Sequence, residues 1–194
     1  FELRLKGNPP EGPEALAEVE AVFSCNGTDY RVKGFYDGGG IYKVRFLPEE
    51  CGLYTWKVQG AAEGEGREEC VKGEAHGLVQ AEGCHFRYED GTRYTPFGTT
   101  VYALAHQEEE IIEQTMESLK NAPFNKVRHC VFPKSYEYNQ NEPEYFAFEK
   151  GASGKWDVNR PDYRFWAHLE KIIMELGEMG IQSDLILFHP YDRW

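Results

Sequence analysis

The sequence predicts a multidomain protein of fold class β plus α/β, in which an antiparallel β-sandwich precedes an α/β region. Residues 1–76 are short runs of alternating apolar and polar side chains separated by turn residues, a pattern typical of strands with one buried face. Residues 85–194 instead alternate strand-like and helical segments. The order strand, helix, strand, helix, strand builds a parallel sheet with crossover helices.

Each run in the amino-terminal part places apolar side chains on one face. The runs hold Phe1, Leu3 and Leu5; Val19, Ala21 and Phe23; Tyr30 and Val32; Ile41, Val44 and Phe46; and Tyr54, Trp56 and Val58. Turns at 26–27, 37–40 and 49–52 separate them, because glycine supplies the positive φ that tight hairpin turns require. We interpret 60–66 as a flexible exposed loop and 69–75 as a last strand. Short strands with this spacing predict an immunoglobulin-like sandwich.

The predicted domains are the sandwich at 1–76, a linker at 77–84 and the α/β part at 85–194. The α/β part opens with a hairpin at 86–94, which turns at Asp90-Gly91. A first parallel strand is expected at 95–103.

The first helix of this part is expected to begin at Glu108–Glu110, because acidic residues suit a helix amino terminus. Its apolar stripe is Ile112, Met116 and Leu119. The second strand is predicted at 126–132 and is ended by Pro133. A second helix follows Pro161-Asp162, with Trp166, Leu169, Ile173, Leu176 and Met179 as its stripe. The apolar run at 181–188 then predicts a third strand that is buried on both faces.

Polar and aromatic residues gather where these strands end, which is where barrel enzymes of this class build their active sites. The candidate substrate-binding residues are Tyr102, His106, Arg128, His189, Tyr191 and Asp192. Such side chains suit a polyhydroxylated ligand, since Arg, His and Asp hydrogen-bond hydroxyls while Tyr offers a flat face to the C–H side of a sugar. The long loop before the second helix adds Tyr136, Tyr138, Tyr145, Phe146 and Phe148 beside Asn139, Asn141 and Glu142. Together these residues predict a carbohydrate cleft.

Each of these histidines has an alternative role as a hydrogen-bonded structural residue, and the aromatic loop has an alternative role as a cover of the barrel rim. His106, His129 and His189 lie on separate strands without the spacing of zinc motifs, so no metal and no cofactor are expected. We interpret Arg128 as a buried guanidinium, which requires a carboxylate at the barrel mouth or beyond residue 194.

Composition narrows the partners and the location of the chain. A formal net charge of -12 without any basic stripe argues against nucleic acid, and the apolar runs are shorter than the about 20 residues of a membrane span. The first residues lack the regions of a signal peptide, which favours the cytoplasm, although a trimmed start leaves export open. The five cysteines form no close pair in sequence, so we interpret them as buried free thiols in a reducing compartment.

Five motifs lie in one order along nearly the whole chain: 35–38 (FYDG), 42–48 (YKVRFLP), 97–100 (FGTT), 124–128 (FNKVR) and 189–194 (HPYDRW). They resemble a group of glycoside hydrolases that carry an immunoglobulin-like sandwich ahead of a barrel similar to clan A glycosidases. The resemblance implies that the chain holds the sandwich and the first β-α-β-α-β part of a (β/α)8 TIM barrel, truncated after the third strand. Leu104 departs from the Trp expected there, which puts one sugar-stacking contact in doubt.

The resemblance also implies an oligosaccharide or glycoside substrate and a retaining mechanism with two carboxylates about 5 Å apart. The acid/base would follow barrel strand four and the nucleophile strand seven, so both are expected beyond residue 194 and this chain alone is expected to be inactive. Glu142 and Asp192 are acids near the predicted cleft, but Asp192 suits a substrate contact better than catalysis. The open edge of a three-stranded sheet predicts pairing with a missing carboxyl-terminal half or self-association.

A non-catalytic carbohydrate-binding module is the alternative function. In that case the sandwich would recognise glycans through Tyr36, Tyr42, Tyr54 and Trp56. Trp56 alternates with Tyr54 along one strand, which favours a core position and therefore the enzyme interpretation.

Overall fold

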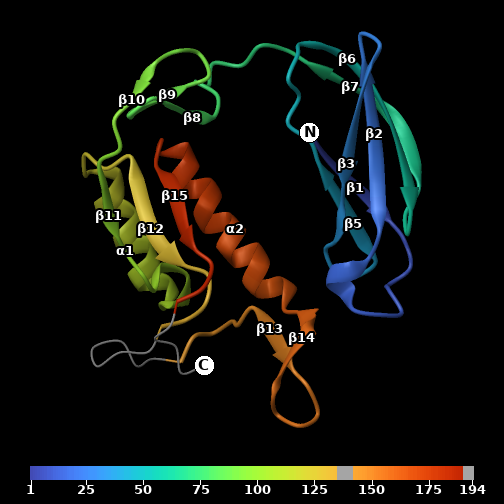
Figure 1. Cartoon of the computed structure of the whole chain (residues 1–194). Helices are drawn as coiled ribbons and strands as arrows, with labels where there is room; N and C mark the ends of the chain where they lie inside the picture. Colours follow the sequence, from blue (N-terminus) through green and yellow to red (C-terminus); the bar gives the residue numbers. More distant parts are fainter. Residues whose placement is uncertain (135–141, 190–194) are drawn as a thin grey trace. The chain divides into compact units, whose positions relative to one another are not determined.

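The computed structural model describes residues 1–134 and 142–189, which divide into two units (Figure 1). The first unit holds Phe1–Glu74 and Lys150–Pro161, and the second holds Ala75–Glu149 and Asp162–Trp194. Six residues that the sequence singles out lie outside the described ranges: Tyr136, Tyr138, Asn139, Asn141, Tyr191 and Asp192. No helix among the described residues is long and apolar enough to cross a membrane.

The first unit contains two antiparallel sheets. One has the strand order β1-β5-β4, formed by β1 (Glu2–Lys6), β5 (Ile41–Arg45) and β4 (Phe35–Tyr36). The other has the order β3-β2-β6-β7, formed by β3 (Thr28–Lys33), β2 (Val19–Cys25), β6 (Gly52–Gly60) and β7 (Gly64–Cys70). A short 3-10 helix, η1 (Glu14–Leu16), precedes β2, and β14 (Trp156–Pro161) lies against it. The chain is therefore rich in β-sheet here, as the alternating runs predict.

Aromatic rings from both sheets form the core of the first unit. Phe23 of β2 stacks on Phe46, which follows β5, with ring centroids 4.4 Å apart. Phe46 also meets Tyr54 of β6 edge to face at 5.5 Å. Phe23 and Tyr54 are fully buried, as the period-two pattern predicts for one face of each strand. Offset and edge contacts of this kind stabilise a pair beyond the burial of its area.

The interpretation of 60–66 as a flexible loop is wrong at both ends, because β6 reaches Gly60 and β7 begins at Gly64, which leaves 61–63 as the connection. Gly64 and Gly66 lie in β7, where they pair with Val58 and Trp56 of β6. A Cβ on Gly66 would lie 2.5 Å from Cζ2 of Trp56. At Gly66 the indole ring therefore occupies the space that a side chain would need, and at Gly64 the Leu5 side chain does so, with Cδ2 at 2.7 Å from the place of a Cβ.

The second unit combines a small antiparallel sheet with a parallel one. The antiparallel sheet has the order β10-β9-β8, formed by β10 (Arg93–Tyr94), β9 (His85–Tyr88) and β8 (Val79–Glu82). The parallel sheet has the order β11-β12-β15, formed by β11 (Gly98–Thr100), β12 (Lys126–Cys130) and β15 (Gln182–Ile186). The strands alternate with η2 (Leu104–His106), α1 (Glu109–Lys120) and α2 (Tyr163–Glu178). The predicted β-α-β-α-β order is confirmed, although each strand is shorter than its predicted segment.

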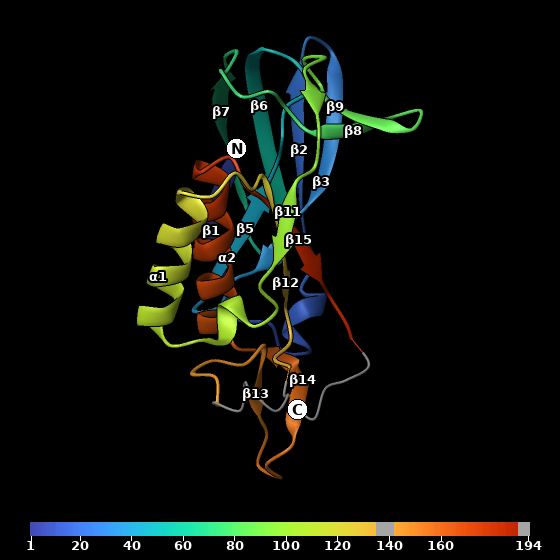
Figure 2. The ribbon, with the colours of Figure 1, turned by 90° about the vertical axis from the view of Figure 1, so that its left-hand side faces the viewer.

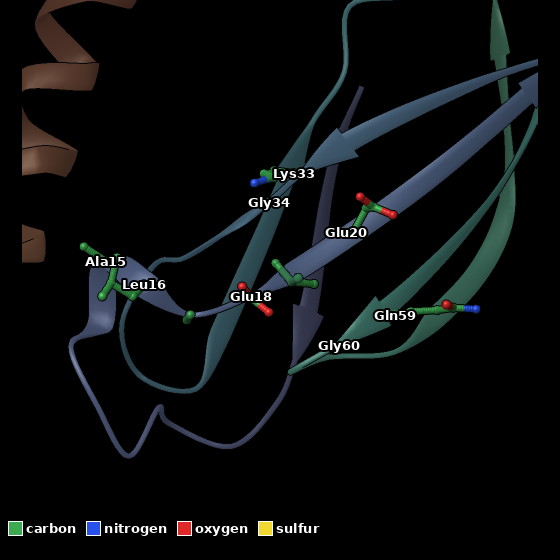
Figure 3. Close-up of a pocket in the computed structure, with 10 residues that line it drawn as sticks. Ala15, Leu16, Glu18, Glu20, Lys33, Gly34, Gln59 and Gly60 are labelled. Atoms are coloured by element: carbon green, nitrogen blue, oxygen red, sulfur yellow. The ribbon is translucent and has the colours of Figure 1, made fainter.

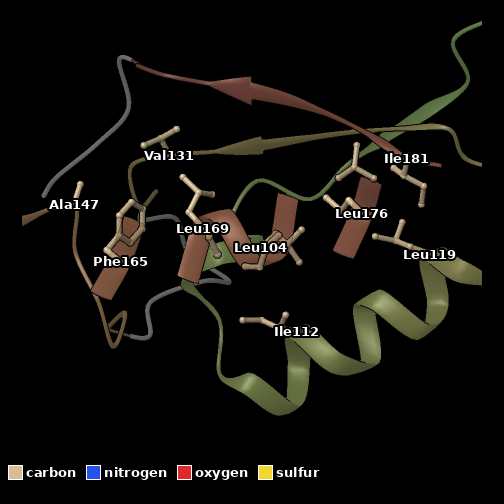
Figure 4. Close-up of a cluster of buried hydrophobic side chains, with 12 residues drawn as sticks. Leu104, Ile112, Leu119, Val131, Ala147, Phe165, Leu169, Leu176 and Ile181 are labelled. Carbon is tan, nitrogen blue, oxygen red and sulfur yellow. The ribbon is translucent and has the colours of Figure 1, made fainter. Parts of the chain in front are cut away.

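Both helices lie on one face of the parallel sheet and enclose an apolar core (Figures 2 and 4). The core contains Leu104, Ala105, Ile112, Leu119, Val127, Val131, Ala147, Phe165, Leu169, Ile172, Leu176 and Ile181. On α2 the fully buried residues are Phe165, Ile172 and Leu176, whereas the predicted Trp166 and Ile173 are only partly buried. The buried face of α2 is therefore centred nearer to Phe165 and Ile172 than the predicted stripe, which leaves Trp166 and Ile173 at its margin.

The long segment between β12 and α2 contains a hairpin of β13 (Phe148–Lys150) and β14. The hairpin is closed at its base, because Asp162 N–H donates to the Ala147 carbonyl at 3.1 Å. Trp166 Nε1 donates to the same carbonyl at 3.0 Å. Asp162 is also the N-cap of α2, where its carboxylate accepts from Arg164 N–H at 3.1 Å. Two hydrogen bonds therefore fix the start of α2 to the Ala147 carbonyl, and a third caps the helix through Asp162.

We expect Leu176→Ala to destabilise the second unit by about 2–5 kcal/mol, because the truncation leaves a cavity in a fully closed core. Urea unfolding followed by the helical circular dichroism signal measures this unit, since both helices lie in it. Met174→Ala on the same helix is the matched control, because Met174 is 62% exposed. Equal losses for the two variants would contradict the described orientation of α2.

We expect Gly66→Ala to destabilise the first unit by about 1–3 kcal/mol, because the added methyl group collides with the Trp56 ring. Hydrogen exchange of the β6 and β7 amides measures the loss. Gly12→Ala is the control, since nothing lies within 4 Å of a Cβ there. Unchanged protection in Gly66→Ala would show that β7 does not pack against Trp56 as described.

Candidate functional site

The carboxyl ends of the parallel strands meet at one edge of the second unit. Arg128 of β12 pairs in register with Thr100 of β11 and with Asp184 of β15, so the three strands end side by side. Two backbone hydrogen bonds extend the contact past the strands: Cys130 N–H donates to the Tyr102 carbonyl at 2.9 Å, and Val131 N–H donates to the Ile186 carbonyl at 3.0 Å. Segments far apart in sequence are therefore held together where the sheet ends.

Five side chains gather at this edge, and we call them the strand-end cluster: Tyr102, Phe132, Lys134, Phe188 and His189. The Lys134 ammonium lies over the Tyr102 ring, 4.2 Å from its centroid, which is a favourable cation–π geometry. Phe188 stacks on Phe132 at 5.5 Å with an interplanar angle of 17°. Tyr102 is 38% exposed and Phe188 is 81% exposed, so the cluster presents aromatic surface beside a cation.

His189 lies in the cluster, but His106 does not. His189 Nε2 is 3.4 Å from the Phe132 carbonyl oxygen. His106 is buried, stacks on Phe165 at 5.7 Å, and has Nε2 3.1 Å from the Val131 carbonyl oxygen. The His106 ring therefore packs beneath the sheet edge, in the surroundings that its structural alternative requires.

His129 is the most enclosed histidine of the second unit. Its side chain is fully buried, and neither ring nitrogen has a hydrogen-bond partner within residues 1–134 and 142–189. Burial lowers the pKa of the imidazole, and the nearby negative charge of Asp184 opposes that shift only in part. His129 is therefore held neutral at neutral pH. Among the described residues no group of three His, Cys, Asp or Glu side chains is arranged to hold a metal ion.

The interpretation of Arg128 as a buried guanidinium is wrong. Its side chain is 54% exposed, on the face of β12 that points away from the helices. Its partner is Asp184, whose Oδ2 lies 2.9 Å from Nη2 and 3.0 Å from Nε. The same Oδ2 is 3.3 Å from Lys126 Nζ. Asp184 is not recognisable as this partner from the sequence, because only the register between two strands that are distant in sequence brings it beside Arg128.

Lys126, Arg128 and Asp184 form what we call the charged face of the sheet. Partial burial acts to raise the pKa of Asp184, but the hydrogen bonds and positive charges of Arg128 and Lys126 outweigh it and lower the pKa below its usual value. Asp184 is therefore ionised at neutral pH, and its charge is shared between two cations.

The first unit carries a hollow of about 540 Å³ at one end of its sheets (Figure 3). Its lining includes Glu18, Glu20, Lys33 and Gln59, with Leu16 at its edge. Glu20 is already paired with Arg31 at 3.1 Å. The lining residues include no aromatic ring, so the hollow lacks the flat apolar platform that stacks on a sugar.

Three of the four aromatic residues proposed for the alternative binding module are not available at the surface. Tyr36, Tyr42 and Tyr54 are buried in the core of the first unit, and Trp56 is covered on one side by Gly64 and Gly66. The expectation that the three tyrosines recognise glycans is therefore wrong, whereas Trp56 is only partly buried and its predicted glycan contact stays a prediction. The cysteine interpretation also needs correction, because Cys51 and Cys84 are exposed although all five thiols are free.

Comparison with known proteins relates both units to glycoside hydrolases. Residues 1–61 match the family model described as a domain of unknown function, DUF5060. A solved structure, the "putative glycoside hydrolase from Bacteroides vulgatus ATCC 8482", is 40% identical over all of this chain, with a TM-score of 0.90. The chain spans 41% of that protein's length. No protein with a curated description matches the sequence.

Two further solved structures are similar over part of the chain. One is named "Glycoside hydrolase", with 16% identity over 57% of this chain and 25% of its own, and a TM-score of 0.40. The other is a glycoside hydrolase family 5 protein from Bacteroides vulgatus ATCC 8482, with 18% identity over 56% of this chain and 24% of its own, and a TM-score of 0.38. The TM-scores of these two structures are too low to support a conclusion about fold or function. The relation of the fold to glycoside hydrolases therefore rests on the structure that is 40% identical.

We expect Asp184→Asn to reduce stability by about 0.2–1 kcal/mol at pH 7, because the lost ion pairs are partly exposed. The pKa of Asp184 is lowered in the folded state, so its contribution is present above the unfolded pKa of about 3.9 and is lost as the pH falls through the folded value. The difference between wild type and variant in urea unfolding should therefore be constant above about pH 5 and vanish in acid. Glu178→Gln, which removes an exposed carboxylate of the same unit, should show no such difference.

Proposed function

We propose that this chain is the amino-terminal portion of a glycoside hydrolase, in which it supplies an immunoglobulin-like sandwich and part of the substrate cleft. In this proposal 1–76 is the sandwich and 85–194 begins a (β/α)8 barrel of the clan A type. The predicted linker at 77–84 contains β8 (Val79–Glu82), which belongs to the small antiparallel sheet of the second unit. The similarity to the solved Bacteroides vulgatus protein along the whole chain supports the proposal. The share of that protein which the chain spans, 41%, is compatible with a longer enzyme.

The observation that carries the proposal is the strand-end cluster at the carboxyl edge of three parallel strands. Barrel enzymes build their active sites at this edge because the loops after each strand converge there. The cluster combines exposed aromatic rings with a lysine and a histidine, which are groups that stack on sugars and hydrogen-bond their hydroxyls. Tyr102 and His189 would contact substrate directly, and Tyr191 and Asp192 would extend the contact surface.

The charged face would serve the same cleft from the inside of the barrel. In a (β/α)8 barrel the helices cover the outside, so the face opposite α1 and α2 is the barrel interior. Arg128 and Asp184 lie on that face and already bind each other. Arg128 would then act as a positioning residue that keeps a positive charge near the carboxyl edge, rather than as a free ligand for substrate.

The proposed chemistry is hydrolysis with retention, which requires a protonated carboxylic acid and a carboxylate nucleophile about 5 Å apart. Asp184 does not suit the role of the acid, because the adjacent cations lower its pKa and keep it ionised at neutral pH. Both catalytic carboxylates are therefore proposed to lie beyond residue 194, and the role of this chain is to bind and orient the sugar.

We expect the chain to bind oligosaccharides weakly and Tyr102→Ala to reduce the affinity about 2- to 12-fold, because one aromatic stack stabilises by about 0.5–1.5 kcal/mol. Chemical shift perturbation with xylo-, manno-, cello- and chito-oligosaccharides measures binding and locates it.

Phe97→Ala is the control for this variant, since Phe97 is an exposed aromatic residue before β11, at the opposite edge of the sheet. Equal losses for Tyr102→Ala and Phe97→Ala, or perturbations confined to the first unit, would contradict the proposed cleft.

A further inference from the structure

Three cysteines gather at one end of the four-stranded sheet of the first unit. Cys25 is the last residue of β2, and Cys70 is the last residue of β7. Cys51 directly precedes β6, whose first residue, Gly52, pairs in register with Cys70. The three residues are distant in sequence, and the antiparallel pairing of β2, β6 and β7 brings them together.

Gly52 explains how these thiols come so close. Its φ is 151°, a conformation that residues with a side chain rarely adopt. A Cβ at this position would lie 2.9 Å from Cys25 Sγ, so the sulfur fills the place of the absent side chain. Cys70 Sγ lies 4.0 Å from the Val71 carbonyl oxygen, and the Cys51 thiol is near enough to raise the pKa of Cys70. The register of β6 with β7 therefore places Cys51 next to Gly52, the residue that lies directly opposite Cys70.

We propose that Cys51 and Cys70 form a reversible disulfide by exchange with a small-molecule disulfide such as oxidised glutathione. Cys51 is exposed, Cys70 is partly exposed and Cys25 is buried, so the first two can meet a dissolved oxidant. Cys84 is exposed as well, but it lies in the turn between β8 and β9 of the other unit. The pair is thus selected by its access to solvent and by the register of β6 with β7.

The exchange has two balanced steps. The Cys51 thiolate attacks one sulfur of oxidised glutathione, which forms a protein–glutathione disulfide and releases one glutathione thiolate. Cys70 then loses its proton, attacks the Cys51 sulfur and displaces the second glutathione. The two protein thiols are oxidised by two electrons, and one glutathione disulfide is reduced to two thiols.

The order of these steps follows from the surroundings of Cys70. Burial raises the pKa of the Cys70 thiol, and the neighbouring Cys51 thiol raises it further. Cys70 is therefore rarely a thiolate at neutral pH and is the poorer first nucleophile. Once Cys51 carries glutathione, the position of Cys70 on the neighbouring strand gives it a high effective concentration for the second step.

Oxidation would tie together the ends of β6 and β7. β7 is an edge strand, since the sheet order is β3-β2-β6-β7, so it has a neighbour on one side alone within the sheet. A link at its last residue restricts the unfolded chain and keeps this edge closed. The proposed disulfide thus makes the stability of the β6–β7 edge depend on the ratio of oxidised to reduced glutathione around the protein.

The test uses the whole chain treated with oxidised glutathione, then denatured and alkylated with iodoacetamide. Intact mass spectrometry should show three alkylated cysteines in place of the five that the reduced chain offers, that is two fewer. Proteolytic mapping under non-reducing conditions should recover a linked peptide that contains Cys51 and Cys70. Treatment with reduced glutathione should restore alkylation of all five.

Two variants keep the test decisive. Cys84→Ser should still lose the same two thiols, whereas Cys51→Ser, at an exposed position, should form no internal link. The proposal is overturned if every thiol of the wild type is alkylated, if only a mixed disulfide with glutathione forms, or if the linked peptide contains Cys25 or Cys84.

Discussion

The register between β12 and β15 is the constraint on which the second unit depends. It sets Arg128 opposite Asp184, and by alternation it turns Val127 and His129 toward the helices. A slip of one residue would move the charged side chains into the apolar core and expose Val127 to water, which is costly in both directions. The ion pair contributes little energy because it is half exposed, yet it is compatible with one register alone. The register of β12 with β15, and not the strength of the Arg128–Asp184 ion pair, therefore determines which residues face the core and which form the charged face.

Local pattern predicts the alternation of parallel strands and helices in the second unit, but not β8 or the β13–β14 hairpin, and not the contacts between distant strands. The alternation around Phe23 and Tyr54 identified core positions correctly, because a period of two is a property of each strand by itself. Gly64 and Gly66 were interpreted as a loop, since nothing nearby in sequence indicates that they lie against Trp56. Asp184 was missed for the same reason. On α2 the helix was predicted correctly, but its face was misjudged because Trp166 is apolar and yet only partly buried.

The two units hold their polar groups in different ways. In the second unit, ionised groups lie on the open face of a sheet and aromatic rings lie at its carboxyl edge, where both remain accessible. In the first unit, most aromatic rings are buried in the core. The accessible reactive groups are thiols at the end of the four-stranded sheet. The candidate site and the cysteine pair are therefore independent features, each determined by which side chains its own sheet leaves uncovered.

The closed base of the β13–β14 hairpin has a consequence for how such a chain can evolve. Ala147 and Asp162 are joined by a hydrogen bond, so the residues between them leave the second unit and return to the same point. The entropy cost of closing a loop grows slowly with its length. Lengthening, shortening or replacing this excursion would leave the N-cap of α2 and the parallel sheet in place. The second unit therefore tolerates changes in the length of this segment, whereas β14 packs against η1 and is constrained by that contact in the first unit.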